Sequence, residues 1–192
     1  MEQGEPRNHH FRQKEMVETI IDKYYSDNPA LRDTLIRHSK SVAQRALEVA
    51  ERHPEFNADS TVLYEAAMLH DIGIYLTDAP GIGCFGTEPY IRHGILGAEL
   101  LRREGLPRHA RVAERHTGTG LTRQAILEQQ LPLPAADFVP ETIEEQIICY
   151  ADKFFSKTRL EQAKTDEQVL VSLKRFGQES VERMASWMKL FG

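Results

Sequence analysis

Apolar residues recur at helical spacing along almost the whole chain, and this pattern most constrains the fold. After Asn28, for example, the apolar stripe runs through Leu31, Leu35 and Val42. Apolar residues three or four positions apart indicate an amphipathic helix, and we find no convincing alternation of the kind that strands show. Proline, glycine and capping residues delimit the segments. The pattern predicts helices over 12–26, 29–53, 59–73, 91–104, 107–116, 122–130, 141–159 and 166–189.

The length of the chain fits a single domain. Its 192 residues contain no internal repeat, no low-complexity tract and no linker that would separate a second domain. The glycine-rich segment 77–90 and the proline-punctuated segment 131–140 are predicted loops between helices. The expected fold class is therefore all-α, a single-domain helical bundle.

Charge and cysteine content limit the function classes. Asp and Glu number 29 against 24 Lys and Arg, which gives a formal net charge of -5. This charge argues against bulk nucleic-acid binding but leaves room for a small anionic substrate in a local basic pocket. Cys84 and Cys149 cannot make a disulfide framework, no apolar run is long enough to span a bilayer, and the polar N-terminus does not resemble a signal peptide. We therefore expect a cytoplasmic protein with no membrane partner.

Six ionisable residues occupy positions where a predicted helix should face the core. Burying a carboxylate without a partner costs several kcal/mol, so such groups are normally paired or bound to a metal. A single inward histidine is more often a hydrogen-bonded core residue, but six such groups in one domain predict a metal site. Imidazole and carboxylate suit Fe, Mn, Zn, Co or Ni, and the absence of thiolate argues against a structural zinc site. The six are His38, His70, Asp71, His93, His116 and Asp152.

Four of these residues carry a family resemblance. His38 lies in RHSKSVAQRALEVA, His70 and Asp71 in EAAMLHDIGIY, and Asp152 in CYADKFF. In this order the motifs resemble the HD superfamily of metal-dependent phosphohydrolases, in its HDIG form. The resemblance covers residues 31–159 and implies a helical bundle with the metal between its helices. It divides the chain into an N-terminal extension with the first helix (1–30), the metal-binding core (31–159) and a C-terminal helix packed on that core (160–192).

Two further histidines indicate a binuclear subtype. His93 in YIRHGILGAELL and His116 in AERHTGTGLT match the histidines that two-metal members add. The resemblance implies one metal held by His38, His70, Asp71 and Asp152, and a second held by His93 and His116, with Asp71 bridging the two. His109 is the rival of His116 on the same predicted helix, and His9, His10 and His53 are expected to be solvated.

Basic residues near these motifs are candidates for substrate binding. Lys153 follows Asp152 directly, so on a helix it should flank the site, where it could clamp a phosphate and act in catalysis beside Asp71. Arg92 and Arg123 adjoin the two added histidine segments and are further candidates. For all three the alternative is an ordinary solvated helix face. The glycines of GIGCFG lack the preceding strand of a dinucleotide site, so this loop is interpreted as a lid.

The leading functional hypothesis is hydrolysis of a phosphate ester or nucleotide by a metal-activated hydroxide. The substrate would be a phosphomonoester, a phosphodiester or a dinucleoside polyphosphate. The last of these is suggested by the added histidines, which resemble those of bacterial hydrolases that split symmetrical diadenosine tetraphosphate. The expected cofactor is two divalent transition-metal ions, Fe or Mn first, with Zn, Co, Ni or Mg as alternatives. One competing hypothesis is an HD-fold di-iron oxygenase, which uses the same six ligands. The other is a non-catalytic metal or ligand sensor.

Overall fold

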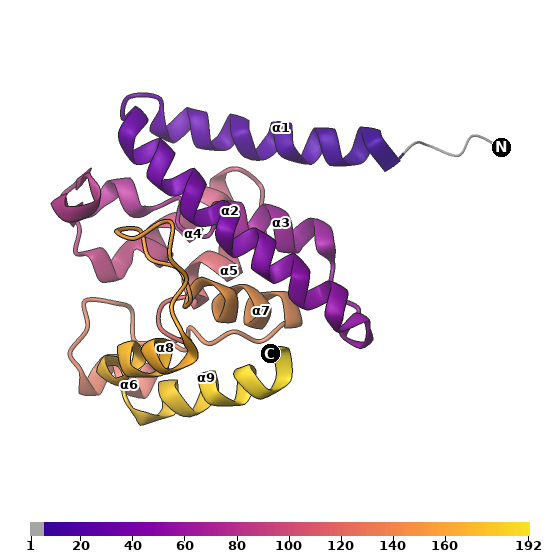
Figure 1. Cartoon of the computed structure of the whole chain (residues 1–192). Coiled ribbons are helices and arrows are strands. Elements are labelled where there is room, and N and C mark those ends of the chain that lie inside the picture. Colours follow the sequence, from indigo (N-terminus) through magenta and orange to yellow (C-terminus); the bar gives the residue numbers. More distant parts are fainter. Residues whose placement is uncertain (1–5) are drawn as a thin grey trace.

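A computed structural model describes residues 6–192, with side chains from Arg12 onward. The described chain is a bundle of helices (Figure 1), which confirms the all-α prediction. The helices are α1 (Pro6–Tyr25), α2 (Pro29–Arg52), α3 (Ser60–Leu69), α4 (His93–Arg103), α5 (Pro107–Arg115), α6 (Arg123–Glu128), α7 (Ile143–Asp152), α8 (Asp166–Leu173) and α9 (Gln178–Phe191).

The helices that carry the site begin close to the predicted positions, and a side-chain cap marks the start of each of three of them. Asn28 accepts a hydrogen bond from the backbone N–H of Leu31 at the start of α2. Asp59 caps α3, and Thr142 caps α7 in a reciprocal capping box with Glu145. Each cap satisfies backbone N–H groups that have no partner within the helix, which defines the residue at which the helix begins.

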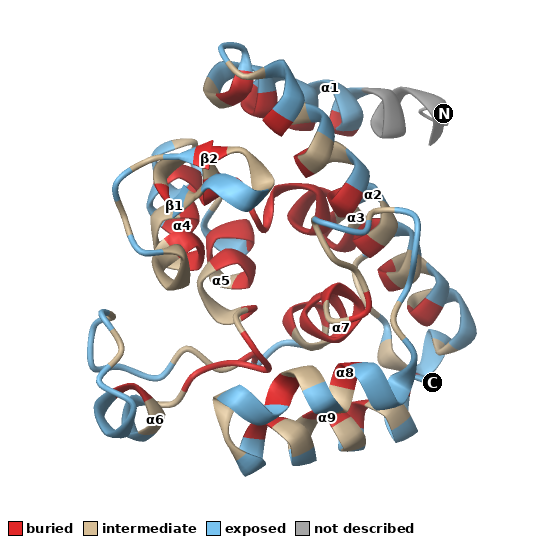
Figure 2. Cartoon of the chain, turned by 60° about the vertical axis from the view of Figure 1, so that its left-hand side comes forward, coloured by how far each residue is buried: buried red, intermediate tan, exposed pale blue. Residues whose placement is uncertain are grey.

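Helix α7 lies at the centre of the core. It packs against α2, α3, α5 and α9, and Figure 2 shows it buried almost along its whole length. The core also includes Leu35 of α2, Leu63 of α3 and Phe191 of α9, all fully buried. α2 packs along α3, and α4 packs along α5. The two helix pairs are joined by contacts between α3 and α5, and α7 packs against both pairs. The proposed metal ligands lie on these same elements.

Three local predictions were wrong. The helix predicted over 141–159 ends at Asp152, because the N–H groups of Phe154 and Phe155 bond three residues back and the chain turns away. The helix predicted over 166–189 is two helices: α8 ends at Leu173, a 3-10 turn follows over Lys174–Phe176, and Gly177, with a φ of 96°, precedes α9. Segment 77–90 includes a short antiparallel pair, β1 (Asp78–Ala79) and β2 (Cys84–Phe85), too brief to show alternation in sequence.

Across residues 6–192, no helix is both long enough and apolar enough to span a membrane.

Candidate metal centre

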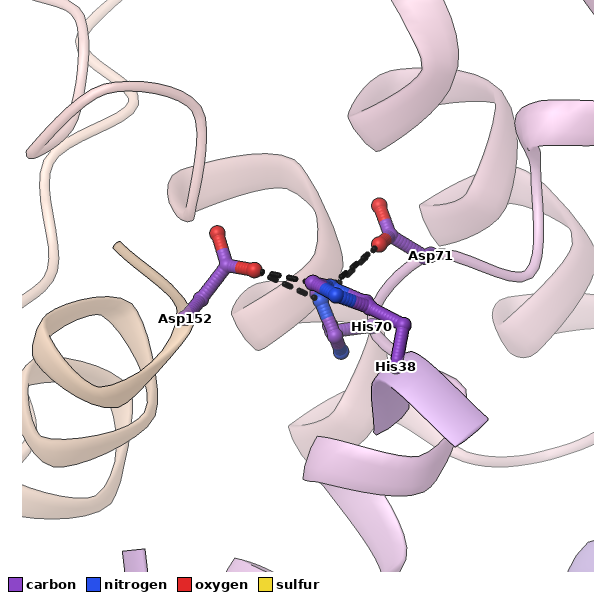
Figure 3. Close-up of side chains that lie close together, drawn as sticks. All are labelled: His38, His70, Asp71 and Asp152. Carbon is purple, nitrogen blue, oxygen red and sulfur yellow. Dashed lines mark hydrogen bonds and ion pairs between the residues drawn. The ribbon is translucent and has the colours of Figure 1, made fainter. Parts of the chain in front are cut away.

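The six predicted ligands converge in the interior of the bundle. His38 comes from the middle of α2, whereas the other five come from helix ends or from the turn after α3. All six are buried, and the most exposed of them, Asp152, shows only 8% of its surface. Figure 3 shows four of the six side chains pointing toward one another from α2, the end of α3 and the end of α7. Helix ends let the chain bend away from the cluster immediately after each ligand.

The first group of ligands surrounds one point. Nε2 of His38 lies 3.2 Å from Oδ2 of Asp71 and 3.0 Å from Oδ1 of Asp152. Nε2 of His70 lies 3.1 Å and 3.3 Å from the same two oxygens. One ligand atom from each of the four residues lies within 4.8 Å of all the others, which is close enough to share one ion.

The second group shares Asp71 with the first. Its other oxygen, Oδ1, lies 3.4 Å from Nε2 of His93 and 3.3 Å from Nε2 of His116. Asp71 therefore presents one carboxylate oxygen to each group, which is the arrangement of a ligand that bridges two ions.

Backbone hydrogen bonds orient three of the imidazoles. Nδ1 of His70, His93 and His116 each donates to the carbonyl three residues earlier, at 2.6–2.7 Å. This bond holds Nδ1 protonated, so Nε2 is the nitrogen turned toward the cluster. A donor that is already orientated in this way needs no rearrangement to bind a metal.

The second histidine pair fits a cation. Burial and the neighbouring His116 lower the pKa of His93 to about 3, and burial lowers the pKa of His116, so both rings are neutral at pH 7. Their Nε2 atoms nevertheless lie only 3.0 Å apart. Since both Nδ1 atoms are protonated, two nitrogen lone pairs face each other, and this contact becomes favourable when a cation lies against both.

The carboxylates are held ionised. Burial alone would raise their pKa, but His70 and Lys157 hold the pKa of Asp71 well below its usual range, and Lys153 and His38 do the same for Asp152. Burial disfavours protonation of His70, yet Asp71 and Asp152 raise its pKa to about 9. In the absence of metal, a proton on His70 therefore supplies the positive charge that the carboxylates require. Chemically, the donor set of imidazole and carboxylate suits divalent metal ions.

Two lysines contact the ligand carboxylates directly. Nζ of Lys157 lies 2.6 Å from Oδ2 of Asp71, and Nζ of Lys153 lies 2.5 Å from Oδ2 of Asp152 and 2.8 Å from the backbone oxygen of His116. Lys153 was expected to flank the site. It lies closer to the centre than that, because its ammonium group contacts a ligand carboxylate. Lys157 was expected only as one of several basic residues near the site, with no contact assigned, on a helix that was expected to run through 159.

The centre opens into a cavity of about 440 Å³, a size that suits a small-molecule ligand. Its lining includes His93, His116 and Asp152 of the centre. The charged groups of the remaining wall are all cationic: Lys153, Lys157, Lys164 and Arg175.

Other predicted residues lie outside this cavity. Arg92 pairs with Glu88 at 3.3 Å, Arg123 is exposed, and neither belongs to the lining. Nor does any residue of the GIGCFG loop, 81–86, which was expected to form a lid, although Tyr90 at the end of segment 77–90 does line the cavity.

The remaining histidines do not join the ligands. His109, the rival of His116, is buried, but its Nε2 lies 2.9 Å from Glu65 instead of joining either group. His53 is only half-buried and pairs with Glu55, while His9 and His10 lie outside the described side chains.

Comparison with known proteins identifies the family. The HD domain family matches residues 35–156, which is most of the chain. The chain belongs to the HD domain family. That family match includes all six proposed ligands and Lys153, whereas Lys157, Lys164 and Arg175 lie beyond its end.

Similar proteins occur in several archaea. The chain is 38% identical over 67% of its length to a tRNA (cytidine(56)-2'-O)-methyltransferase of Picrophilus torridus, and 35% identical over 82% of its length to the enzyme of the same name from Thermoplasma volcanium. These matches span only 33% and 41% of the two relatives. An uncharacterized protein of Methanocaldococcus jannaschii is 31% identical over 79% of this chain and 84% of its own length. No solved structure matches.

Proposed function

We propose that this protein is a metal-dependent phosphohydrolase that cleaves a phosphate ester or nucleotide. One observation carries the proposal. Two donor groups that share Asp71 open into a single cavity whose other charged side chains are all cationic. A metal centre next to a cationic wall is the arrangement that a substrate with a negatively charged reacting group requires.

Each part of the site has a definite task in this proposal. Two divalent ions, Fe or Mn first, would lower the pKa of a water molecule and neutralise phosphoryl oxygens. His38, His70, His93, His116 and Asp152 would hold these ions, with Asp71 shared between the two groups of ligands. Lys153 and Lys157 bind the phosphoryl oxygens and orient the ester for attack, since both ammonium groups reach the ligand carboxylates and the cavity.

The same six ligands also suit a di-iron oxygenase, so the ligands alone do not separate the two chemistries. The cationic wall favours phosphate hydrolysis over oxygenation, because it matches the charge of a phosphate ester. The intact, buried ligand set favours an enzyme over a passive sensor.

RNA is a second candidate substrate, favoured by the names of two relatives. Both are named tRNA methyltransferases, but this chain corresponds to at most 41% of either one. In this version the cavity accepts a phosphate of an RNA end, and binding would weaken steeply as salt is raised. The expectation of no bulk nucleic-acid binding is tested by the same measurement.

The deciding experiment is a substrate screen with and without oxygen. Purified protein, stripped of metal and reloaded with Mg, Mn, Fe, Co, Ni or Zn, is assayed on phosphomonoesters, cyclic and linear nucleotides, dinucleoside polyphosphates and tRNA. We expect release of phosphate or a nucleoside phosphate under anaerobic conditions with a redox-inert ion. Lys153→Met should lower kcat/KM at least about tenfold, as loss of a charged hydrogen bond predicts, and exposed Lys174→Met should not. Turnover that requires both iron and oxygen would establish the oxygenase instead.

A further inference from the structure

Two cations of the cavity wall form no ion pair with the metal ligands. These are Lys164 and Arg175, and both come from the chain beyond residue 156, where the HD family match ends. Lys164 is half-buried in the loop after α7, and its backbone N–H donates to the carbonyl of Phe154 at 2.8 Å. Among the described residues, no carboxylate lies within ion-pair distance of either side chain.

The Phe176 ring supports Arg175 in the wall of the cavity. The ring packs on Gly118, two residues after His116, so closely that a Cβ at Gly118 would lie 3.1 Å from the ring. The guanidinium of Arg175 lies over the same ring, 4.7 Å from its centre. The C-terminal segment therefore builds one wall of the cavity, and this wall carries both a cation and an aromatic surface.

The cations of the cavity repel one another. Burial lowers the pKa of Lys164, and although Asp152 opposes this, the positive charges of Lys153, Arg175 and Lys157 add to the lowering. Lys153 and Lys157 are compensated by the ligand carboxylates that they contact. Lys164 and Arg175 have no such compensation, so an anion that enters the cavity would stabilise them most.

We propose that Lys164 and Arg175 form a second anion subsite, which selects phosphate esters whose leaving group carries another anionic group. The inference rests on the proposed function and refines its substrate class to nucleotides with two or more phosphates. In the reaction, the oxygen of water bonds to phosphorus, the bond from phosphorus to the leaving-group oxygen breaks, and the leaving group takes a proton. The second phosphate stays on the leaving group, against Lys164 and Arg175, while Phe176 offers an apolar face to the rest of the nucleotide.

Anion binding by the metal-free full-length chain tests the subsite without turnover. Isothermal titration with phosphate, pyrophosphate and tripolyphosphate in EDTA should show affinity that rises with each added phosphate. Lys164→Met and Arg175→Met should each remove about tenfold or more of the added affinity and leave phosphate binding unchanged. Lys164→Arg should retain it, and Lys174→Met, a change at an exposed lysine outside the cavity, should behave as wild type.

Kinetics then separate this inference from the proposed function. In the metal-loaded protein, the two variants should lose kcat/KM about tenfold or more on a nucleoside 5'-diphosphate and keep it on p-nitrophenyl phosphate. The subsite is overturned, and the hydrolase stands, if the wild-type protein hydrolyses both substrates but the variants lose no more kcat/KM on the diphosphate than on p-nitrophenyl phosphate. Equal binding of the three anions has the same consequence. Selective polyphosphate binding with no hydrolysis under any metal supports the subsite and overturns the hydrolase.

Discussion

Single residues in this centre have roles that differ in kind. Asp71 is the only described residue that belongs to both groups of ligands, and it is fully buried. Other ligands serve one group each. The loss of Asp71 should therefore affect both ions, whereas the loss of His93 and His116 should affect one.

Metal content tests this difference. Asp71→Asn preserves shape but removes the charge that two divalent ions share, so bound metal should fall from about two equivalents per chain toward zero. The double change His93→Ala with His116→Ala should leave about one equivalent. His53→Ala, at a half-buried histidine outside the cluster, is the control and should keep the wild-type value. Elemental analysis after metal-replete dialysis gives the numbers, and full metal retention in Asp71→Asn would refute the bridging role.

The histidine pKa values make the stability of the metal-free protein depend on pH in both directions. His70, with a pKa raised to about 9, stabilises the folded chain below about pH 6.5 and loses this contribution as pH rises through 9. His93, with a pKa lowered to about 3, and His116 stay neutral when folded, so stability falls below about pH 6.5 as the unfolded chain takes up protons.

Denaturant titrations in EDTA should therefore show greatest stability near pH 6.5. The decline toward pH 9 should amount to at most about 3 kcal/mol, given 1.36 kcal/mol for each unit of pKa difference. His70→Gln should flatten this alkaline side, and exposed controls should not. Equal free energies of unfolding at pH 6.5 and pH 9 would show that His70 is not the proton carrier.

At the scale of elements, Gly73 explains why the HDIG motif ends in glycine. The turn after α3 passes so close to α4 that a Cβ at Gly73 would lie 2.4 Å from both the backbone nitrogen of Gly97 and the backbone oxygen of His93. This contact brings the end of α3, which carries His70 and Asp71, against the helix that begins with His93. The motif therefore joins the two halves of the metal centre through packing as well as through its ligands.

Gly73→Ala should separate α4 from this turn. We expect a loss of stability of about 1–3 kcal/mol from overpacking, together with weaker binding of the ion that His93 and His116 hold. Gly81→Ala is the matched control, because a Cβ at Gly81 meets nothing within 4 Å. Thermal denaturation and metal titration measure the two effects. Unchanged binding of the second ion in a folded Gly73→Ala protein would argue against the link.

At the scale of the whole molecule, the C-terminal helices complete both the core and the cavity. Phe191 of α9 is fully buried and meets the rings of Phe56 and Tyr150, and Trp187 donates to Gln146 of α7 at 3.3 Å. Closer to the site, the hydroxyl of Thr119 hydrogen-bonds Ser180 of α9. We therefore expect the segment after residue 160 to unfold as one cooperative unit with the rest of the bundle.

Phe191→Ala should destabilise the entire chain by about 3–5 kcal/mol, the usual cost of removing a buried aromatic ring. Leu190→Ala, at the exposed neighbour, should change stability by less than about 0.5 kcal/mol. Urea denaturation followed by circular dichroism and by Trp187 fluorescence should give a single, coincident transition. Separate transitions for the two probes would show that the C-terminal helices unfold independently.

The sequence by itself determined the helical architecture and the six inward histidines and aspartates that we propose as ligands. Both follow from local rules, because helical spacing places a residue on the apolar face and capping residues such as Asn28, Asp59 and Thr142 begin each helix. Only the tertiary structure decided the environment of the ligands. Lys157, Lys164 and Phe176 reach the cavity from irregular segments, whose side-chain directions depend on contacts with distant elements and follow no period. For the same reason Arg92 and Arg123, close to the ligands in sequence, lie outside the cavity. Lys153 adjoins Asp152 in sequence and does line the cavity, but Lys164 and Arg175 join it from positions that sequence distance does not associate with the centre.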